Sequence, residues 1–177
     1  MFGDSNKYES KELREVSNII AGGDKPDGVS KVKMDTKCYP VYANGVENEG
    51  LQGYYDSYKI DKPSVTISAR GTIGKTFIRK EKFTPIVRLI TITPKHELDV
   101  TYLKYALDAV SLTGNGSSQQ QITVPNIKKI KIPVPNIDKQ LIYTRLVEEI
   151  DKSKFEIENA LSELKKLYQK IIADNIQ

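Results

Sequence analysis

The sequence has few of the residues that build disulfides, metal sites and common catalytic centres. Among 177 residues there is one cysteine, Cys38, and one histidine, His96. A single cysteine excludes a disulfide within the chain, argues against a thiolate zinc cluster and favours a reducing compartment such as the cytoplasm. One histidine cannot complete a metal site without further ligands at suitable spacing. We therefore expect neither a metal nor another cofactor.

Long apolar runs and paired acidic residues are also missing. No apolar run approaches the roughly 18 residues of a membrane span, and the polar, charged N-terminal residues are unlike a signal peptide. Aspartate and glutamate are scattered, without the paired spacing that a magnesium-dependent nuclease needs, and neither Cys38 nor His96 has a visible catalytic partner. These absences predict a cytoplasmic protein that is not an enzyme and does not bind membranes.

The positive charge is concentrated in one part of the chain. The net charge is +4, but residues 137–177 hold seven Lys and Arg against eight Asp and Glu. Residues 57–92 carry eight bases against only Asp61 and Glu81. A locally basic face suits DNA or RNA. The alternative is an ordinary solvated surface.

Two helices are expected in the first 135 residues. Within 8–20, apolar residues recur at helix-like spacing and Gly22-Gly23 follows as a stop. Within 99–112, a second apolar stripe is followed by Gly114.

Strands are expected between and after these helices. Alternating residues predict strands over 64–69 and 76–79, and the β-branched run 84–93 predicts a buried strand. In 122–135, three prolines argue against a helix and favour short strand edges. The expected class is therefore α+β, with a β-rich domain over 1–135.

The C-terminal segment has a different character. After Asn136, a plausible N-cap, there is neither proline nor glycine, and apolar residues follow a heptad pattern for about four heptads. The pattern predicts a helix about 60 Å long over 136–177, which needs a partner helix because a small domain cannot cover its stripe. The alternative is a helix lying on its own domain. The expected dimerisation residues are Leu146, Ile150, Ile157, Ala160, Leu164, Leu167 and Ile171.

The segment ARGTIGKT, Ala69–Thr76, matches a permissive outline of a nucleotide-binding phosphate loop. Such a loop works only if a helix begins directly after it, so that the helix N-terminus faces the phosphates. Here the alternating TFIR follows, and Pro85 comes soon after. We therefore expect a strand, a turn and a second strand, in which Gly71 and Gly74 supply the turn.

The chain resembles the DNA-specificity (S) subunit of type I restriction–modification systems, because seven short sequence segments occur in the family's order. They are YPVYANG, GLQGYYDSY, ISARGTIGK, FTPIVRLITITPK, VTYLKYAL, GSSQQQI and IKKIKIPVPNIDKQ. The resemblance implies a target recognition domain that binds duplex DNA and a long helix that acts as a spacer. It also implies partners: DNA adenine methyltransferase (modification) subunits and a motor-nuclease (restriction) subunit.

This chain has one domain and one helix, whereas the family's usual subunit has two of each. It therefore resembles a half-subunit, either a natural single-repeat form or a fragment. A homodimer through the C-terminal helix would restore the two-domain arrangement and would recognise a split, symmetric site.

The candidate DNA-binding residues follow from side-chain chemistry. Cations and hydroxyls suit phosphate, and amides and tyrosine suit base edges. The phosphate candidates are Lys31, Lys33, Arg70, Lys75, Arg79 and Lys82; the base candidates are Tyr42, Asn44, Gln119 and Gln120; Ser117 and Ser118 suit either, and Thr72 is a further candidate DNA contact.

Three other classes stay open at this point. The chain could be a truncated or decoy interaction module that sequesters methyltransferase. It could bind nucleic acid, such as RNA, outside restriction–modification. A nucleotide-using enzyme is the third class, and it would require the phosphate loop.

Overall fold

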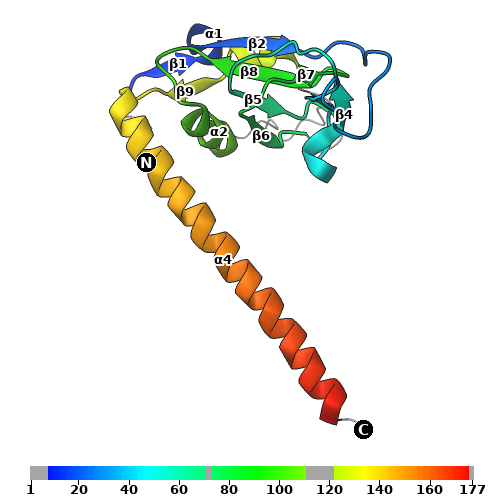
Figure 1. The fold of residues 1–177 in the computed structure, drawn as a ribbon. Helices are drawn as coiled ribbons and strands as arrows, with labels where there is room; N and C mark the ends of the chain where they lie inside the picture. Colours follow the sequence, from blue (N-terminus) through cyan, green and yellow to red (C-terminus); the bar gives the residue numbers. More distant parts are fainter. Residues whose placement is uncertain (1–7, 71–72, 111–121, 176–177) are drawn as a thin grey trace. The chain divides into compact units, whose positions relative to one another are not determined.

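Figure 1 shows the computed structural model, which describes residues 8–70, 73–110 and 122–175. The chain divides into two compact units, Met1–Gln140 and Leu141–Gln177. The first unit is β-rich with short helices, and the second consists of most of one long helix. This mixed α+β architecture with a long C-terminal helix confirms the expected fold class.

A four-stranded antiparallel sheet forms the centre of the first unit. Its strands are ordered β2 (Ser17–Ala21), β8 (Ile90–Pro94), β5 (Ser64–Ile67) and β6 (Thr76–Arg79). Helix α2 (Val100–Ala109) packs against β5, β6 and β8 and contributes buried apolar residues along one side. The predictions of strands over 64–69 and 76–79 and of a helix from residue 99 are confirmed.

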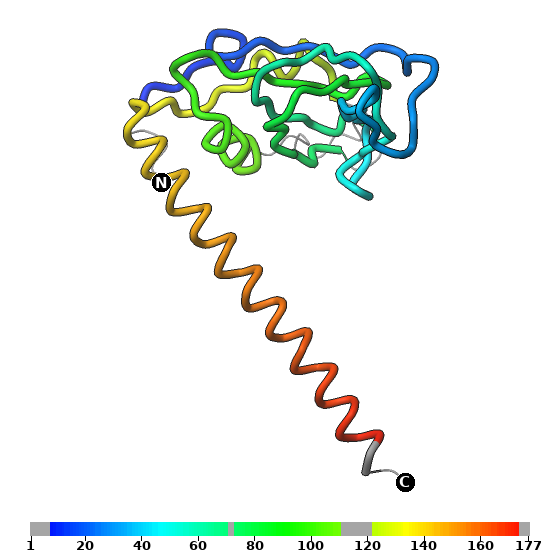
Figure 2. The backbone as a smooth tube through the Cα atoms, in the orientation of Figure 1, coloured from blue at the N-terminus to red at the C-terminus, as the bar shows by residue number. Residues whose placement is uncertain are grey.

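Two smaller sheets complete the unit. One has the order β4 (Leu51–Tyr55), β3 (Tyr39–Tyr42), β7 (Thr84–Pro85), with β3 and β7 parallel. The short 3-10 helix η2 (Glu47–Gly50) joins β3 to β4. The other pairs β1 (Ser10–Glu12) with β9 (Lys131–Pro133), and Figure 2 shows these segments side by side, blue beside yellow.

The predicted helix over 8–20 is wrong. Only α1 (Leu13–Val16) is helical, and the chain then enters β2, where Ile19 is buried and its neighbours Asn18 and Ile20 are exposed. The spacing of Leu13, Val16 and Ile19 fits one helical face, but it also fits one turn followed by an alternating strand. Pairing of β2 with β8 decides in favour of the strand.

Two further predictions need correction. The strand expected over 84–93 is interrupted at Val87–Arg88, where a turn separates β7 from β8. In 122–135, Pro125 lies in the first turn of the short helix α3 (Val124–Lys128), where its missing N–H breaks no hydrogen bond. The strand expected in the same stretch is present as β9.

The segment that resembled a phosphate loop is a β-hairpin connection. β5 and β6 pair antiparallel from Ser64↔Arg79 to Ile67↔Thr76, and the backbone of Ser68 continues the ladder to Lys75. Gly74 has a φ of +84°, which confirms the expected turn role of this glycine. Gly71 lies outside the described residues. Strand β6 begins directly after Lys75, so this segment does not lead into the helix that a phosphate loop needs.

Helix α4 (Ile137–Asn175) begins where the sequence predicts. The Asn136 side-chain oxygen accepts a hydrogen bond from the backbone N–H of Lys139 (3.2 Å), which caps the first turn. The fully buried side chain of Gln140 accepts from the Asp99 N–H (2.9 Å) and donates to the carbonyl oxygens of Glu97 and Pro135 (both 2.8 Å). These hydrogen bonds attach the first turn of α4 to the rest of the first unit. Among the described residues, no helix combines the length and apolar character needed to cross a membrane.

Candidate nucleic-acid interface

Two loops of the first unit are joined by one side chain, that of Asn44. Its amide nitrogen donates to the carbonyl oxygen of Val87 (2.7 Å), and its amide oxygen accepts from the backbone N–H of Ala69 (2.8 Å). Val87 belongs to the turn between β7 and β8, and Ala69 to the connection between β5 and β6. Asn44 therefore couples the backbone positions of the two loops that carry Arg88 and Arg70.

The Val87–Arg88 turn has unusual backbone geometry. The Leu89 N–H donates to the Ile86 carbonyl (3.0 Å), and both residues between them have positive φ, 49° and 61°. A tight turn with two positive φ angles normally uses Asn-Gly or similar residues, because a β-branched residue such as valine clashes with its own backbone there. Such geometry costs about 1–3 kcal/mol per residue and persists only when the surroundings enforce it.

Gly22 and Gly23 hold the turn in this geometry through backbone hydrogen bonds. Their carbonyl oxygens accept from the N–H groups of Arg88 (3.0 Å) and Val87 (2.7 Å). A Cβ at Gly22 would lie 2.6 Å from the carbonyl carbon of Pro85, so only glycine allows these two backbone segments to approach this closely. The Asn44 amide also donates to the Val87 carbonyl, so three hydrogen bonds connect the turn to the rest of the domain while Val87 stays 50% exposed.

Arg70 and Arg88 line the same small cavity. It has a volume of about 140 Å³ and is also lined by Ile122 and Thr123. Both arginines are exposed, and the Ile122 N–H donates to the Ala69 carbonyl (3.1 Å). The structure thus brings the predicted Arg70 together with Arg88, which sequence reasoning missed. The only sequence signal for Arg88 was its place in the basic stretch 57–92.

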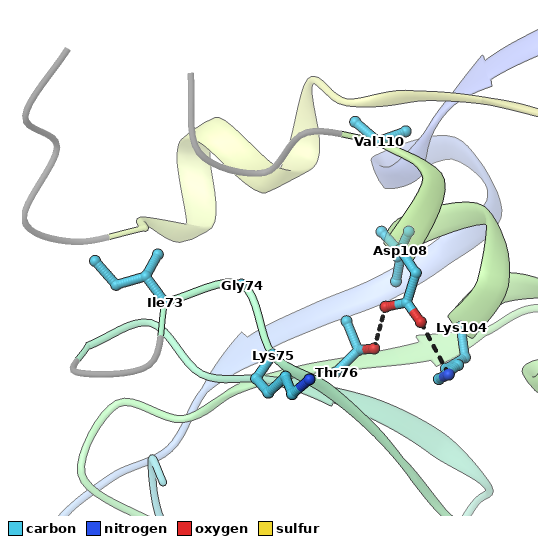
Figure 3. Close-up of a pocket in the computed structure, with 8 residues that line it drawn as sticks. Ile73, Gly74, Lys75, Thr76, Lys104, Asp108 and Val110 are labelled. Carbon is cyan, nitrogen blue, oxygen red and sulfur yellow. Dashed lines mark hydrogen bonds and ion pairs between the residues drawn. The ribbon is translucent and has the colours of Figure 1, made fainter. Parts of the chain in front are cut away.

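Lys75 lies on the other side of the hairpin connection, next to α2. Lys75 and Thr76 line a cavity of about 310 Å³ together with Lys104 and Asp108. Figure 3 shows these side chains. The Asp108 carboxylate accepts a hydrogen bond from the Thr76 hydroxyl and pairs with Lys104 (2.9 Å), so it ties α2 to β6. Lys75 itself is exposed.

Arg79 and Tyr42, both predicted to contact DNA, instead form part of the interior. Arg79 is 3% exposed; it pairs with Glu49 (2.7 Å), and its guanidinium carbon lies 3.7 Å from the centre of the Tyr42 ring. The Tyr42 hydroxyl donates to Glu81 (3.0 Å). Burial lowers the pKa of Arg79 and raises the pKa of Tyr42 to about 12. Both residues therefore leave the set of candidate DNA contacts.

The remaining predicted residues are dispersed. Lys31 donates to the Gln52 carbonyl (3.3 Å), and Lys33 is exposed in the same segment between β2 and β3. Lys82 donates to the Tyr58 hydroxyl (3.3 Å), which raises the pKa of Lys82. Five predicted contacts lie outside the described residues: Thr72, Ser117, Ser118, Gln119 and Gln120.

Within the described ranges, no three His, Cys, Asp or Glu side chains gather in a way that could hold a metal ion. Three exposed cations, Arg70, Lys75 and Arg88, lie on the connections between strands. Guanidinium and ammonium groups of this kind bind phosphate oxygens, and arginine also binds base edges.

Comparison with known proteins identifies the family. The family model of the type I restriction modification DNA specificity domain matches residues 5–166. Two Mycoplasma pneumoniae proteins named type I specificity subunits are 37% identical over 138 residues and 33% identical over 135 residues. The matches cover 77% and 76% of this chain but only 41% and 37% of those proteins. The chain thus spans less than half the length of these relatives.

Solved structures share the fold. The HsdS subunit from Thermoanaerobacter tengcongensis superposes with a TM-score of 0.67 at 18% identity, covering 88% of this chain and 40% of that one. The type I S subunit from M. genitalium gives a TM-score of 0.64 at 17% identity, covering 83% and 40%. The Mycoplasma pneumoniae relatives are named specificity subunits and the two solved structures are named S subunits, and none of these names is that of an enzyme. This chain belongs to the family of type I restriction–modification DNA specificity domains.

Proposed function

We propose that the chain recognises one half of a split site in duplex DNA for a type I restriction–modification system. The observation that carries the proposal is the pair of exposed arginines, Arg70 and Arg88, on two loops that Asn44 couples. Lys75 adds a third exposed cation, and all three lie on the β5–β6 and β7–β8 connections. In this role Arg70 and Lys75 contact backbone phosphates, which orient the domain on the duplex.

Helix α4 supplies the second part of the proposal. Ile157 and Leu164 are 67% and 62% exposed, and the other predicted seam residues that the structure describes are exposed as well. An exposed apolar stripe of this length marks an interaction surface. We assign it to a second copy of this chain in a coiled coil: one chain spans about 40% of the length of its relatives, so a pair would supply two recognition domains.

The homodimer would present its two domains around a two-fold axis, so it should select an interrupted, symmetric site. The chemistry on the DNA would come from partners. In this proposal the dimer directs DNA adenine methyltransferase subunits, and with them the motor-nuclease subunit, to the site. We therefore expect the chain to co-purify with such a methyltransferase.

The DNA-binding proposal predicts a salt-dependent affinity that depends on Arg70 and Lys75. For a mixed-sequence 40-bp duplex, the logarithm of the binding constant should fall linearly with the logarithm of salt concentration. Removing both cations in Arg70→Ala/Lys75→Ala should reduce the magnitude of the slope by about 2 per domain, because each phosphate contact contributes about 0.9. Fluorescence anisotropy across a salt series measures both the binding constant and its dependence on salt concentration.

The matched control removes the same charge elsewhere. Lys154→Ala/Lys165→Ala, on exposed positions of α4, should leave the slope unchanged. Equal effects from both double variants would mean that binding reflects only net charge. Preference for single-stranded RNA over the duplex at the same salt concentration would contradict the proposal.

A further inference from the structure

The Val87–Arg88 turn has an energetically unfavourable backbone conformation and two exposed side chains. A turn with positive φ at both central positions is least costly with Asn-Gly, yet this one holds valine and arginine. Where a sequence departs from local conformational preference and the surroundings enforce the departure, function is the usual reason. What the turn gains is a fixed backbone position from which the side chains of Val87 and Arg88 extend.

A fixed position matters more for bases than for phosphates. Phosphate contacts tolerate long, mobile lysine and arginine side chains, whereas a bidentate arginine–guanine contact requires the guanidinium to lie in the plane of the base. An adjacent apolar side chain such as Val87 suits the methyl group of thymine. The rigid, exposed turn therefore has the properties of a base-contacting element.

We infer that Arg88 and Val87 are specificity-determining residues that contact base edges in the major groove, and that Asn44 is the residue that positions them. This inference rests on the proposed DNA-binding function. Asn44 acts on the turn through the Val87 carbonyl and on the Arg70 loop through the Ala69 N–H, so it sets the spacing between the base-contacting and the phosphate-contacting loops.

The test is sequence selection with the full-length chain. Wild type and variants are incubated with the same pool of duplexes carrying a randomised 20-bp segment, and bound sequences are determined. Arg88→Ala should lose preference at one base position of each half-site, by about tenfold or more, without losing preference at the others. Asn44→Ala should weaken preference at several positions at once, including the one that Arg88→Ala affects, because both loops lose the hydrogen bonds that position them. Arg14 is an exposed arginine in α1, outside these loops, and pairs with Glu12, so Arg14→Ala should select the wild-type sequence.

Val87→Gly separates a role in DNA recognition from a role in folding. Glycine adopts positive φ without steric cost, so this variant should unfold at a Tm about 2–4 °C higher while losing part of its base preference. A purely structural valine would give no change in the selected sequence.

The outcomes distinguish the inference from the function on which it rests. If wild type and Arg88→Ala select the same sequence, the inference is overturned and DNA binding stands. If Arg88→Ala lowers affinity equally for all duplexes and reduces the salt slope by about 1, Arg88 contacts phosphate and the inference is again overturned. If wild type shows no binding to duplex DNA, the proposed function itself is wrong.

Discussion

Replacing Leu164 by lysine should convert the protein from a dimer to a monomer. Leu164 lies in the middle of the apolar stripe of α4 and is 62% exposed in the single chain. In a coiled coil it would be buried in the seam, so each dimer loses two buried leucines and gains two buried charges. Losing one buried leucine side chain costs about 2–5 kcal/mol. The dimer dissociation constant should therefore rise at least a hundredfold, because about 1.4 kcal/mol corresponds to a factor of ten.

Sedimentation velocity over a concentration series measures this change directly. The matched control is Ser162→Lys, which adds the same charge two residues earlier, at a position that the heptad pattern places outside the seam. Ser162→Lys should remain dimeric. A wild-type chain that sediments as a monomer at high concentration would refute the homodimer. Unfolding of the first unit in Leu164→Lys would mean that this stripe packs on the domain.

Replacing Arg79 by alanine should destabilise the first unit strongly. The guanidinium pairs with Glu49, bonds to the Thr66 hydroxyl (3.2 Å) and covers the Tyr42 ring. It also donates to the Glu49 backbone carbonyl, and Asn48 and Glu49 both have positive φ, 48° and 53°. Arg79 therefore holds a second strained turn in the segment that carries Asn44. Its loss removes these contacts and leaves a void, and we expect the free energy of unfolding to fall by about 3 kcal/mol.

Urea unfolding at one fixed chain concentration tests this expectation. The chain offers a matched control in Arg14, which forms an ion pair with Glu12 (2.6 Å) but has a mostly exposed side chain. Arg14→Ala should cost about 1 kcal/mol or less, as exposed pairs do. Arg79→Lys should not restore stability, because an ammonium group cannot reproduce the forked contacts of a guanidinium. Equal losses for Arg79→Ala and Arg14→Ala would show that the Arg79 cluster is not a structural anchor.

Periodic features of the chain were predictable because local spacing alone specifies them. The heptad pattern and Asn136 predicted α4, the apolar stripe after Asp99 predicted α2, and alternation around Gly74 predicted the β5–β6 hairpin. Rejection of the phosphate loop followed from the same logic, since the residues after Lys75 alternate as a strand does. The resemblance to specificity subunits rested on the order of several such segments, and the family match confirms it.

The candidate site required the tertiary structure. Arg79 and Arg88 are both arginines in one basic stretch, and nothing in their neighbours along the chain separates them. Pairing of β5 with β6 places Arg79 over Tyr42 in the interior, whereas the turn bonded to Gly22 and Gly23 leaves Arg88 on the surface beside Arg70. Local spacing thus determined which elements form. Contacts between residues far apart in the chain decided which cations face solvent, because burial depends on partners that the local sequence does not contain.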